Sequence, residues 1–554
     1  RRAHGRRGRW WLAHDAGERA LMAANVVALA KRLSALKALR MPHEQVWRDC
    51  FDHSFPIRGS GLQSNSLTAQ TALDRKARLV DDTATDAGRT LAAALVSGMT
   101  PASSRWFSLE VVGADDAGRQ WLDGCASQLH QEIHASNFDA AAYECSLDMV
   151  GAGWFALYVD VDRKAGGGLR FEQWPLAGVY ASDSTYGGTC DTVLRAYTLT
   201  AVQAVSEFGD ACSEQVRKVA AVEPDSPIEL CHAIYPRSAW VTDAKMARNL
   251  PIASCHFEVQ TRHLLRESGY SEMPVIVPRW VMIPDSVYAV GPMFDALPSA
   301  RQLNEMVRMD LANAELAIAG MWIAEDDGVL NPRTIRVGPR KVIVANSVDS
   351  MKPLSTGGNW QLADERIAQL RGQIRKLLMA DQLQPQDGPA MTATEVHVRV
   401  SMIRQLLGPI YGRLQAEYLQ PLVERCFALA YRAGIFGQAP DSIAGRGFSV
   451  KFIGPLARSQ KMEDVGAIER LNADLAAVVQ MKPEVLDMID FDQATRTLAE
   501  ALGVPLVLLR NADQVQAVRD ARAQQQAAQQ QQQQAQQMQA SAIDAAMQRS
   551  AKAA

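Results

Sequence analysis

The chain has 554 residues, of which 47% are hydrophobic and 21% charged, a composition typical of a globular protein with roughly two to four domains. Its formal net charge of −3 excludes a dedicated electrostatic DNA binder, which carries a strong basic excess, but not a protein through which DNA merely passes. No apolar run approaches the roughly 20 residues that a membrane span requires. The eight cysteines form no C-x-x-C pair, and we expect them to be reduced and buried.

The first 21 residues differ from the rest of the chain. They begin without Met and carry five arginines within ten residues, yet they lead into no apolar core of the kind that a signal peptide has. Ordinary helical patterning starts only after Met22. We interpret residues 1–21 as a translated leader before a natural start at Met22. The alternative is a basic arm that contacts nucleic acid.

The next part of the chain alternates helical and β patterns. In chain order, the patterns predict helices over 23–100 with a turn near 55–66, a strand within 103–112, helices over 115–150, and two strands joined by Gly166–Gly168. Residues 190–290 predict an α+β region of short strands and turns. The fold class that we expect is mainly α with smaller β parts, an α+β protein.

Two long amphipathic helices follow, separated by a compact β insert over 320–360. The first is predicted from a cap at Asp295 to Gly320, which makes it about 35 Å long. Its expected buried stripe consists of Leu303, Val307, Leu311, Ala314 and Ile318. The second helix is predicted over 361–381, with a stripe formed by Ile367, Leu370, Ile374 and Leu377.

A polar loop broken by Pro and Gly follows the second helix, and a very long helix comes next. That helix is predicted to open with a capping box, Thr392 to Glu395, and to bend at Pro409 and Pro421 without ending there. A β segment is predicted at "GFSVKFIGP", and further helices at 461–481, 492–502 and from 512 onward. The Gln-rich end extends the last helix or remains disordered.

The search for catalytic motifs finds no Walker A loop, no dinucleotide fingerprint, no zincin motif and no nucleophile elbow. His130 and His134 are four residues apart on a predicted helix and are candidates for a metal face, although a solvated helix face is the strongly favoured interpretation because no third ligand is evident. Glu325, Asp326 and Asp327 are candidates for a Mg²⁺ site in a nuclease, or an acidic turn before a glycine. The sequence therefore predicts a protein that is not an enzyme and has no cofactor.

A basic cluster near the end of the second long helix has two interpretations. Arg371, Arg375 and Lys376 complement the helix dipole on a solvated face, or they meet phosphates if symmetry repeats them around a pore. A ring turns one weak basic strip per chain into many without giving the monomer a high pI.

Several blocks of the sequence resemble one protein family. They are "TATDAGRTLAAALVSGMTPASSRWFSL", "VPRWVMIPDSVYAVGPMFDALPSARQLNEM", "MTATEVHVRVSMIRQLLGPIYGRLQAEYLQPLVERCFAL" and "LAEALGVPLVLLRNADQVQAVRDARAQQQ". These blocks resemble the head-to-tail connector, or portal, proteins of short-tailed phages, in the order that the family shows. The likeness spans roughly residues 25 to 540, and "VYAVGP" departs from the Gly-rich form expected there.

The resemblance implies a homo-oligomeric ring, typically a dodecamer, at one capsid vertex of a virion that is assembled in the host cytoplasm. Double-stranded DNA would enter through its channel during packaging and leave through it on infection. The implied partners are the large terminase, a tail adaptor, and the major capsid and internal scaffold or core proteins, with no membrane. The packaging ATPase would lie on the terminase chain, which is consistent with the missing Walker motif.

The family's regions map onto this chain by resemblance alone. They are the wing at 22–294, stem helices at 295–319 and 361–381, the clip at 320–360, the tunnel loop at 382–391, a long kinked wing helix with a β segment at 392–455, crown helices at 456–522, and a Gln- and Ala-rich tail at 523–554. The expected channel surface comprises Arg371, Arg375, Lys376, Gln382, Gln384, Gln386 and Asp387. The clip residues expected to bind a partner are Arg336, Arg340 and Lys341.

The polar loop suits a channel, because it offers little phosphate attraction and no base-edge readout to moving DNA. Two other functions remain open at this point. A metal-dependent DNA-processing nuclease would use the carboxylates at 325–327. A tail or minor capsid adaptor would be structural without conducting DNA.

Overall fold

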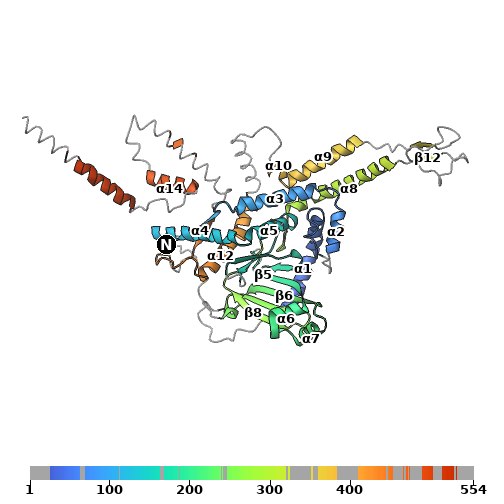
Figure 1. Cartoon of the computed structure of the whole chain (residues 1–554), viewed down its shortest axis with the longest axis horizontal. Helices are drawn as coiled ribbons and strands as arrows, with labels where there is room; N and C mark the ends of the chain where they lie inside the picture. The colour runs from blue at the N-terminus through green and yellow to red at the C-terminus, as the bar shows by residue number, and fades with distance from the viewer. Residues whose placement is uncertain are drawn as a thin grey trace, which may run out of the picture. The chain divides into compact units, whose positions relative to one another are not determined.

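The protein is described by a computed structural model that places residues 25–502, with gaps, together with 514–529 (Figure 1). The gaps are 63–68, 112, 163–166, 186–187, 239, 241–245, 320–321, 325–350, 354–359, 384–407, 409, 444–446 and most of 453–489. The chain divides into two compact units, one formed by residues up to 103 with 131–435, the other by 104–130 with 436 onward. The region 22–294, predicted as one part of the chain, is divided between the two units, because residues 104–130 group with the C-terminal part.

Helices form the start of the first unit, as the sequence predicts. They are α1 Val26–Asp52, α2 Ala69–Ala77, α3 Thr83–Met99 and, after the second unit's segment, α5 Phe138–Ala152. Asn25 caps α1, because its side-chain oxygen accepts a hydrogen bond from the amide of Ala28 at 3.1 Å. The helix α3 packs along α5, which brings the predicted Ala-rich segment into the core.

A five-stranded antiparallel sheet lies beside these helices, in the order β4-β5-β6-β7-β8. Its strands are β4 Val179–Ser182, β5 Thr192–Thr200, β6 Pro227–Pro236, β7 Ile252–Glu258 and β8 Leu264–Tyr270. Four of them are seven to ten residues long, so the predicted α+β character of 190–290 is confirmed, whereas short strands were a wrong expectation for this sheet. Buried apolar side chains lie on both faces of these strands.

The two faces of this sheet pack against different helices. Leu33 and Leu36 of α1 meet Leu194, Cys231 and Phe257 on one face. The short helices α6 Ala201–Phe208 and α7 Glu214–Val222 cover part of the other face, where they share a second apolar cluster with β6 and β8. The alternation of side chains along each strand, with a period of two residues, produces this division.

Smaller β elements surround the main sheet. The strands β2 Leu157–Val161 and β3 Leu169–Gln173 pair antiparallel, and β9 Val275–Ile276 adds a third strand to them. The predicted hairpin is thus confirmed, with Gly167 and Gly168 at φ values of 107° and 112° that favour glycine. The short strands β10 Val281–Met282 and β11 Ala289–Val290 form a further hairpin.

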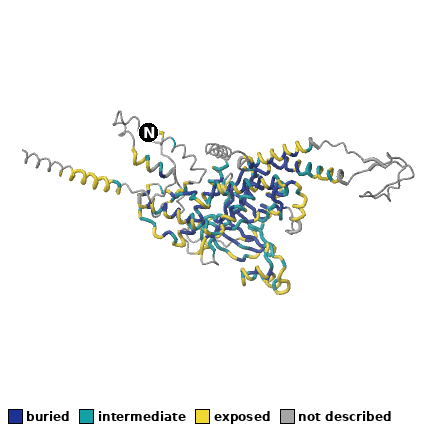
Figure 2. Tube along the Cα trace, turned by 45° about the horizontal axis from the view of Figure 1, so that its top comes forward, coloured by how far each residue is buried: buried dark blue, intermediate teal, exposed yellow. Residues whose placement is uncertain are grey.

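The two predicted amphipathic helices are present as α8 Pro292–Ala319 and α9 Trp360–Leu377, which run side by side in Figures 1 and 2. Asp295 was expected to cap α8, but the helix begins at Pro292 and places Asp295 in its first turn. Proline tolerates the first helical position because its missing N–H would have no partner there. Between the two helices, β12 Trp322–Ala324 pairs with β13 Met351–Pro353, and the rest of the predicted β insert lies outside the described residues.

The described part of the predicted long helix supports its continuity through a proline. A π-helical turn at Gln415–Leu419 leads directly into α12 Gln420–Arg432, so the helix continues past Pro421. A wider turn just before a proline accommodates the missing amide donor. The predicted capping box at Thr392 and the bend at Pro409 lie outside the described residues.

The second unit contains most of α4 Asp116–Ala135 and a two-stranded sheet. The strand β1 Phe107–Glu110 pairs with β14 Ser449–Phe452, which confirms both predicted strands and joins segments about 340 residues apart. Trp106 and Phe107 are buried, so their aromatic rings belong to the core. A helix at Phe491–Leu502 (α14) and helical residues 514–529 agree with the predicted C-terminal helices.

The cysteines are all free thiols, seven of them buried and Cys190 partly buried, as expected. Among the described residues no helix is both long and apolar enough to span a membrane.

Candidate functional site

The α8–α9 pair changes character along its length. In α9 three residues of the predicted stripe, Ile367, Leu370 and Ile374, are at most 6% exposed, and the fourth, Leu377, is partly buried. In α8 the agreement is weaker: Leu303 is buried and Val307 and Ala314 are partly buried, whereas Leu311 is 54% exposed. The expectation of a buried Leu311 is therefore wrong for the single chain. Met309 is also exposed, at 55%, but it lies two residues away on the helix and therefore points to a different side of α8.

Arg371 is held inside the chain by an aspartate at the start of α3. Its Nε and a terminal guanidinium nitrogen donate to Oδ2 of Asp81 at 3.0 and 2.9 Å. Asp81 is buried and also accepts a hydrogen bond from the amide of Thr83 at 2.9 Å. Burial by itself would raise the pKa of the Asp81 carboxyl, but the hydrogen bonds from Thr83 and Arg371 outweigh it and hold the pKa below its ordinary value.

This contact ties α9 to α3 and gives Arg371 a structural partner. No local sequence pattern predicts this pair, because the two residues are 290 positions apart. The arginine still leaves 46% of its side chain exposed. The guanidinium of Arg371 therefore binds Asp81, while nearly half of the side chain remains accessible to solvent.

Arg375 and Lys376 are arranged differently. Both are exposed in the last turn of α9, where cations interact favourably with the helix dipole. Neither forms an ion pair with any residue that the structure describes. Of the three basic residues predicted at this helix end, these two remain available to an external anion.

The segment after α9 turns sharply before the polar loop. Leu378 and Ala380 are buried, and Met379 between them adopts a left-handed φ of 58°. A further short helix, α10 Ala380–Leu383, packs on α3 and α9. The predicted second helix therefore ends at Leu377 rather than 381, and Gln382 lies in α10 rather than in a loop. The other predicted loop residues, Gln384, Gln386 and Asp387, lie outside the described residues.

A buried ion pair secures the π-helical turn in the first unit. Arg279 follows β9 and donates from its Nε and a terminal nitrogen to the carboxylate of Glu417 at 2.9 and 2.7 Å. The backbone amide of Arg279 donates to the same carboxylate at 3.1 Å. Burial alone would lower the pKa of Arg279, but the hydrogen bonds to Glu417 outweigh it and raise the pKa. The sequence gives no signal for this pair, because Arg279 and Glu417 are 138 positions apart.

The candidate metal residues find no support in the described part of the chain. His134 donates from Nδ1 to the carboxylate of Asp139 at 2.8 Å, and no group of three or more His, Cys, Asp or Glu among the described residues is arranged to hold a metal ion. Glu325, Asp326 and Asp327 lie outside the described residues. So do the predicted clip residues Arg336, Arg340 and Lys341.

Comparison with protein families gives one match that covers most of the chain. The family model described as "Bacteriophage head to tail connecting protein" matches residues 27–509. Because the match spans both compact units, it concerns the whole architecture rather than one local motif.

Two curated proteins of phages are similar over nearly their whole length. The "Probable portal protein" of Bordetella phage BPP-1 is 28% identical over 515 residues, which is 90% of this chain and 91% of that protein. The "Portal protein" of Salmonella phage epsilon15 is 28% identical over 517 residues, again 90% and 91% of the two chains. Among solved structures, a chain of the "Virion of native gene transfer agent (GTA) particle" aligns with 72% of this chain and 91% of its own length, at 11% identity. Its TM-score of 0.31 is too low to establish a shared fold.

Proposed function

Because the chain belongs to the bacteriophage head to tail connecting protein family, we propose that it is a portal protein: a structural ring at one capsid vertex through which double-stranded DNA is packaged and ejected. One observation carries the proposal, namely the similarity to two phage proteins named as portal proteins over about nine-tenths of each chain. The family connects head and tail, and the proposed role is mechanical rather than enzymatic.

Assembly into a ring of identical copies, for which we propose twelve, is supported by the surface of α8. Leu311 is more than half exposed, although it lies on the same predicted stripe as the buried Leu303. A neighbouring copy that covers this surface would bury it, as apolar patches on assembling subunits are buried. Cyclic repetition also places the same helix face at every position around an axis.

The regions of the chain follow from this assignment. We propose α8 and α9 as stem helices, 320–360 as the clip, the segment up to 391 as the tunnel loop, the sheet-bearing part of the first unit as the wing, and the C-terminal helices as the crown. The clip residues Arg336, Arg340 and Lys341 would contact an acidic surface of the large terminase during packaging and of the tail adaptor later. The capsid and internal scaffold or core proteins would surround the ring in the virion.

The channel chemistry that we propose is weak and independent of DNA sequence. Arg375 and Lys376 supply the free cations, because Arg371 already binds Asp81. The polar loop contributes Gln382, Gln384, Gln386 and Asp387. Charge-neutral amides touch a moving duplex without the strong phosphate contacts that would stop it.

The decisive experiment is the oligomeric state of the purified full chain, measured by native mass spectrometry and negative-stain microscopy. A closed ring with a bore wide enough for a DNA duplex is expected. A protein that remains a monomer at micromolar concentration, or a ring without such a bore, would overturn the proposal. Leu311→Glu should shift the population towards smaller species, because a buried charge opposes the proposed contact. Its matched control is Leu39→Glu, which changes a leucine on α1 that is 65% exposed, against 54% for Leu311.

A second experiment tests the channel residues. The double variant Arg375→Glu with Lys376→Glu is expected to assemble normally and to alter the amount of DNA packaged or the rate of ejection. Normal packaging and ejection by these variant particles would remove both residues from the proposed channel surface while leaving the ring untouched.

A further inference from the structure

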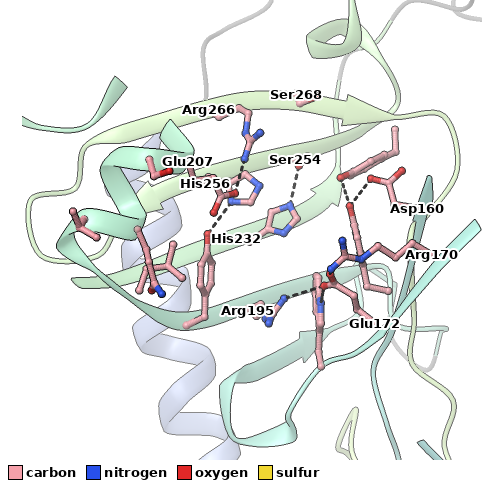
Figure 3. A pocket seen from close by; sticks show the side chains of 18 residues that line it. Asp160, Arg170, Glu172, Arg195, Glu207, His232, Ser254, His256, Arg266 and Ser268 are labelled. Atoms are coloured by element: carbon pink, nitrogen blue, oxygen red, sulfur yellow. Dashed lines mark hydrogen bonds and ion pairs between the residues drawn. The ribbon is translucent and has the colours of Figure 1, made fainter. Parts of the chain in front are cut away.

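A large polar pocket lies on the sheet face that α6 covers only in part. Its volume is about 1010 Å³, and its walls come from β2, β3, the main sheet and α6 (Figure 3). This size is at the upper end of what small-molecule sites occupy, so the pocket accommodates more than a single ion. All of its lining belongs to the first unit, and none of it belongs to the helix pair described above.

Four side chains form a row across the floor of the pocket. The strand register places Arg195 opposite His232, His232 opposite His256, and His256 opposite Arg266. Directly opposed residues in an antiparallel sheet point to the same face, and Figure 3 shows the four side chains together. Three strand spacings separate the two arginine Cα atoms, which is about 14 Å.

The two histidines at the centre of the row are uncharged at neutral pH. Their rings stack with centroids 3.8 Å apart, and the buried His232 shares a hydrogen bond of 2.9 Å with Ser254. Burial lowers the pKa of His232 and lowers that of His256 to about 3. The cationic groups of the floor are therefore the two arginines at its ends.

Arg195 is the one whose charge is poorly compensated. Its guanidinium lies over the rings of Trp174 and Tyr197, with centroid distances of 4.7 and 5.3 Å, but it makes no hydrogen bond to any described residue. The nearest carboxylate oxygen, on Glu172, is 3.7 Å away and belongs to a side chain that Arg170 approaches to 2.7 Å. Burial lowers the pKa of Arg195, and the charge of Glu172 opposes this only in part.

Two arginines of the same unit that are more deeply buried than Arg195, whose side chain is 28% exposed, provide the contrast. Arg40 donates to three backbone carbonyls and to Glu44, and Arg279 donates to Glu417 and to the carbonyl of Gly188. In Arg279 these acceptors raise the pKa in spite of burial, whereas in Arg195 burial prevails. A guanidinium with five donors, whose nearest carboxylate oxygen is 3.7 Å away, retains donors for a bidentate contact with a ligand.

We propose that this pocket binds a carboxylate group, which completes the coordination of Arg195 and is carried by an organic acid or by an acidic side chain of a partner protein. A phosphate ester is less suitable, because Asp160, Glu172 and Glu207 also line the pocket and would repel a second negative charge. Tyrosine and serine hydroxyls around the row supply further donors to the body of the ligand. The site is independent of DNA passage, so its failure would leave the proposed portal function standing.

The test is isothermal titration calorimetry on the purified full-length assembly with three probes. Glutarate represents a free organic acid, N-acetyl-glutamate N-methylamide represents a protein-borne carboxylate, and inorganic phosphate is the competing anion. Binding of glutarate alone identifies a free acid as the ligand class, and binding of the amide, with or without glutarate, identifies a side chain of a partner. Binding of neither carboxylate, or tighter binding of phosphate, overturns the proposal.

Variants of the row make the test specific. Arg195→Met should weaken carboxylate binding at least tenfold, and Arg195→Lys should weaken it less, because an ammonium keeps the charge but loses the planar fork. Glu172→Gln should tighten binding severalfold, since it removes the carboxylate that competes for Arg195. A merely structural Arg195 would not produce that gain, so Glu172→Gln decides even if Arg195→Met fails to assemble.

The matched control is Lys218→Met on α7, an exposed lysine outside the pocket whose loss lowers the net charge by the same amount. Its binding should equal that of the unchanged protein. Equal weakening by Lys218→Met and Arg195→Met would mean that the overall field rather than the pocket governs binding, and would overturn the proposal.

Discussion

Charged side chains in the interior of the first unit have partners within the chain, whereas the two cations in the last turn of α9 have none among the described residues. Inside, Arg40 and Arg279 are surrounded by acceptors from distant parts of the chain, and Arg425 donates to Glu272 and to the carbonyl of Val159. On α9, Arg375 and Lys376 meet no counter-ion among the described residues, and the neighbouring α8 exposes Met309 and Leu311. The paired charges of the interior stabilise the fold, whereas the exposed cations and apolar side chains of α8 and α9 are available to bind another molecule.

The largest expected effect comes from breaking a charge pair of the interior. Glu417→Gln keeps the shape of the side chain but leaves Arg279, which is 3% exposed, without its counter-charge. Removing one partner of a buried pair costs about 3 kcal/mol. Urea denaturation, followed by the circular dichroism of the helices, should show a loss of that size in the free energy of unfolding.

The matched control is Glu214→Gln, the same chemical change in a pair with Lys218 in which both side chains are 75% exposed. No measurable loss is expected there, because solvent screens exposed pairs. If Glu417→Gln destabilised the protein no more than Glu214→Gln does, the interior charges would not support the fold as the contrast requires.

A second prediction concerns the buried histidines of the sheet. The pKa of His256 is about 3 in the folded chain and 6.5 in the unfolded chain. The unfolded state therefore binds the proton first as the pH falls. The stabilising contribution is complete above pH 6.5 and is lost as the pH falls towards 3. At pH 5 the loss amounts to about 2 kcal/mol, from about 1.4 kcal/mol for each pH unit.

The pH dependence of the free energy of unfolding, measured between pH 8 and pH 5, checks this expectation. His256→Asn should unfold more easily at pH 8 because it leaves a space, but its stability should decline less steeply with acid than that of the unchanged protein. Equal slopes for the two proteins would show that His256 is protonated as readily when folded as when unfolded.

The sequence predicted elements where the information is local. The stripe of Ile367, Leu370 and Ile374 is confirmed because a period of 3.6 residues fixes which side chains share a helix face. The same reasoning failed for Leu311, since periodicity identifies an apolar face but not what covers it. The end of α9 was placed four residues late, because the left-handed Met379 gives no signal in composition.

Pairings between distant segments were beyond the reach of the sequence. The row from Arg195 to Arg266 exists only through the register of four strands, and the contact of Arg371 with Asp81 joins elements 290 residues apart. Burial, hydrogen bonding and charge compensation all depend on such pairings. The family resemblance identified the class of protein correctly, yet the separation of Arg371 from its two neighbours on α9 required side-chain positions.

The smallest expected effect concerns two arginines of α9. It compares Arg371, which is bound to Asp81, with Arg375, which has no ion-pair partner among the described residues. Arg371→Met removes two hydrogen bonds to Asp81 and leaves a buried carboxylate whose hydrogen bonds come from the backbone and side chain of Thr83. Since the arginine is 46% exposed, the loss is discounted for solvent to about 1 kcal/mol. Arg375→Met, one turn further along the same helix, should leave the free energy of unfolding unchanged because no described residue pairs with it. Denaturation of the two variants side by side measures the difference at constant net charge and constant chemistry. Equal stability would mean that Asp81 does not hold Arg371 in solution, and all three basic residues of α9 would then be equally available to DNA.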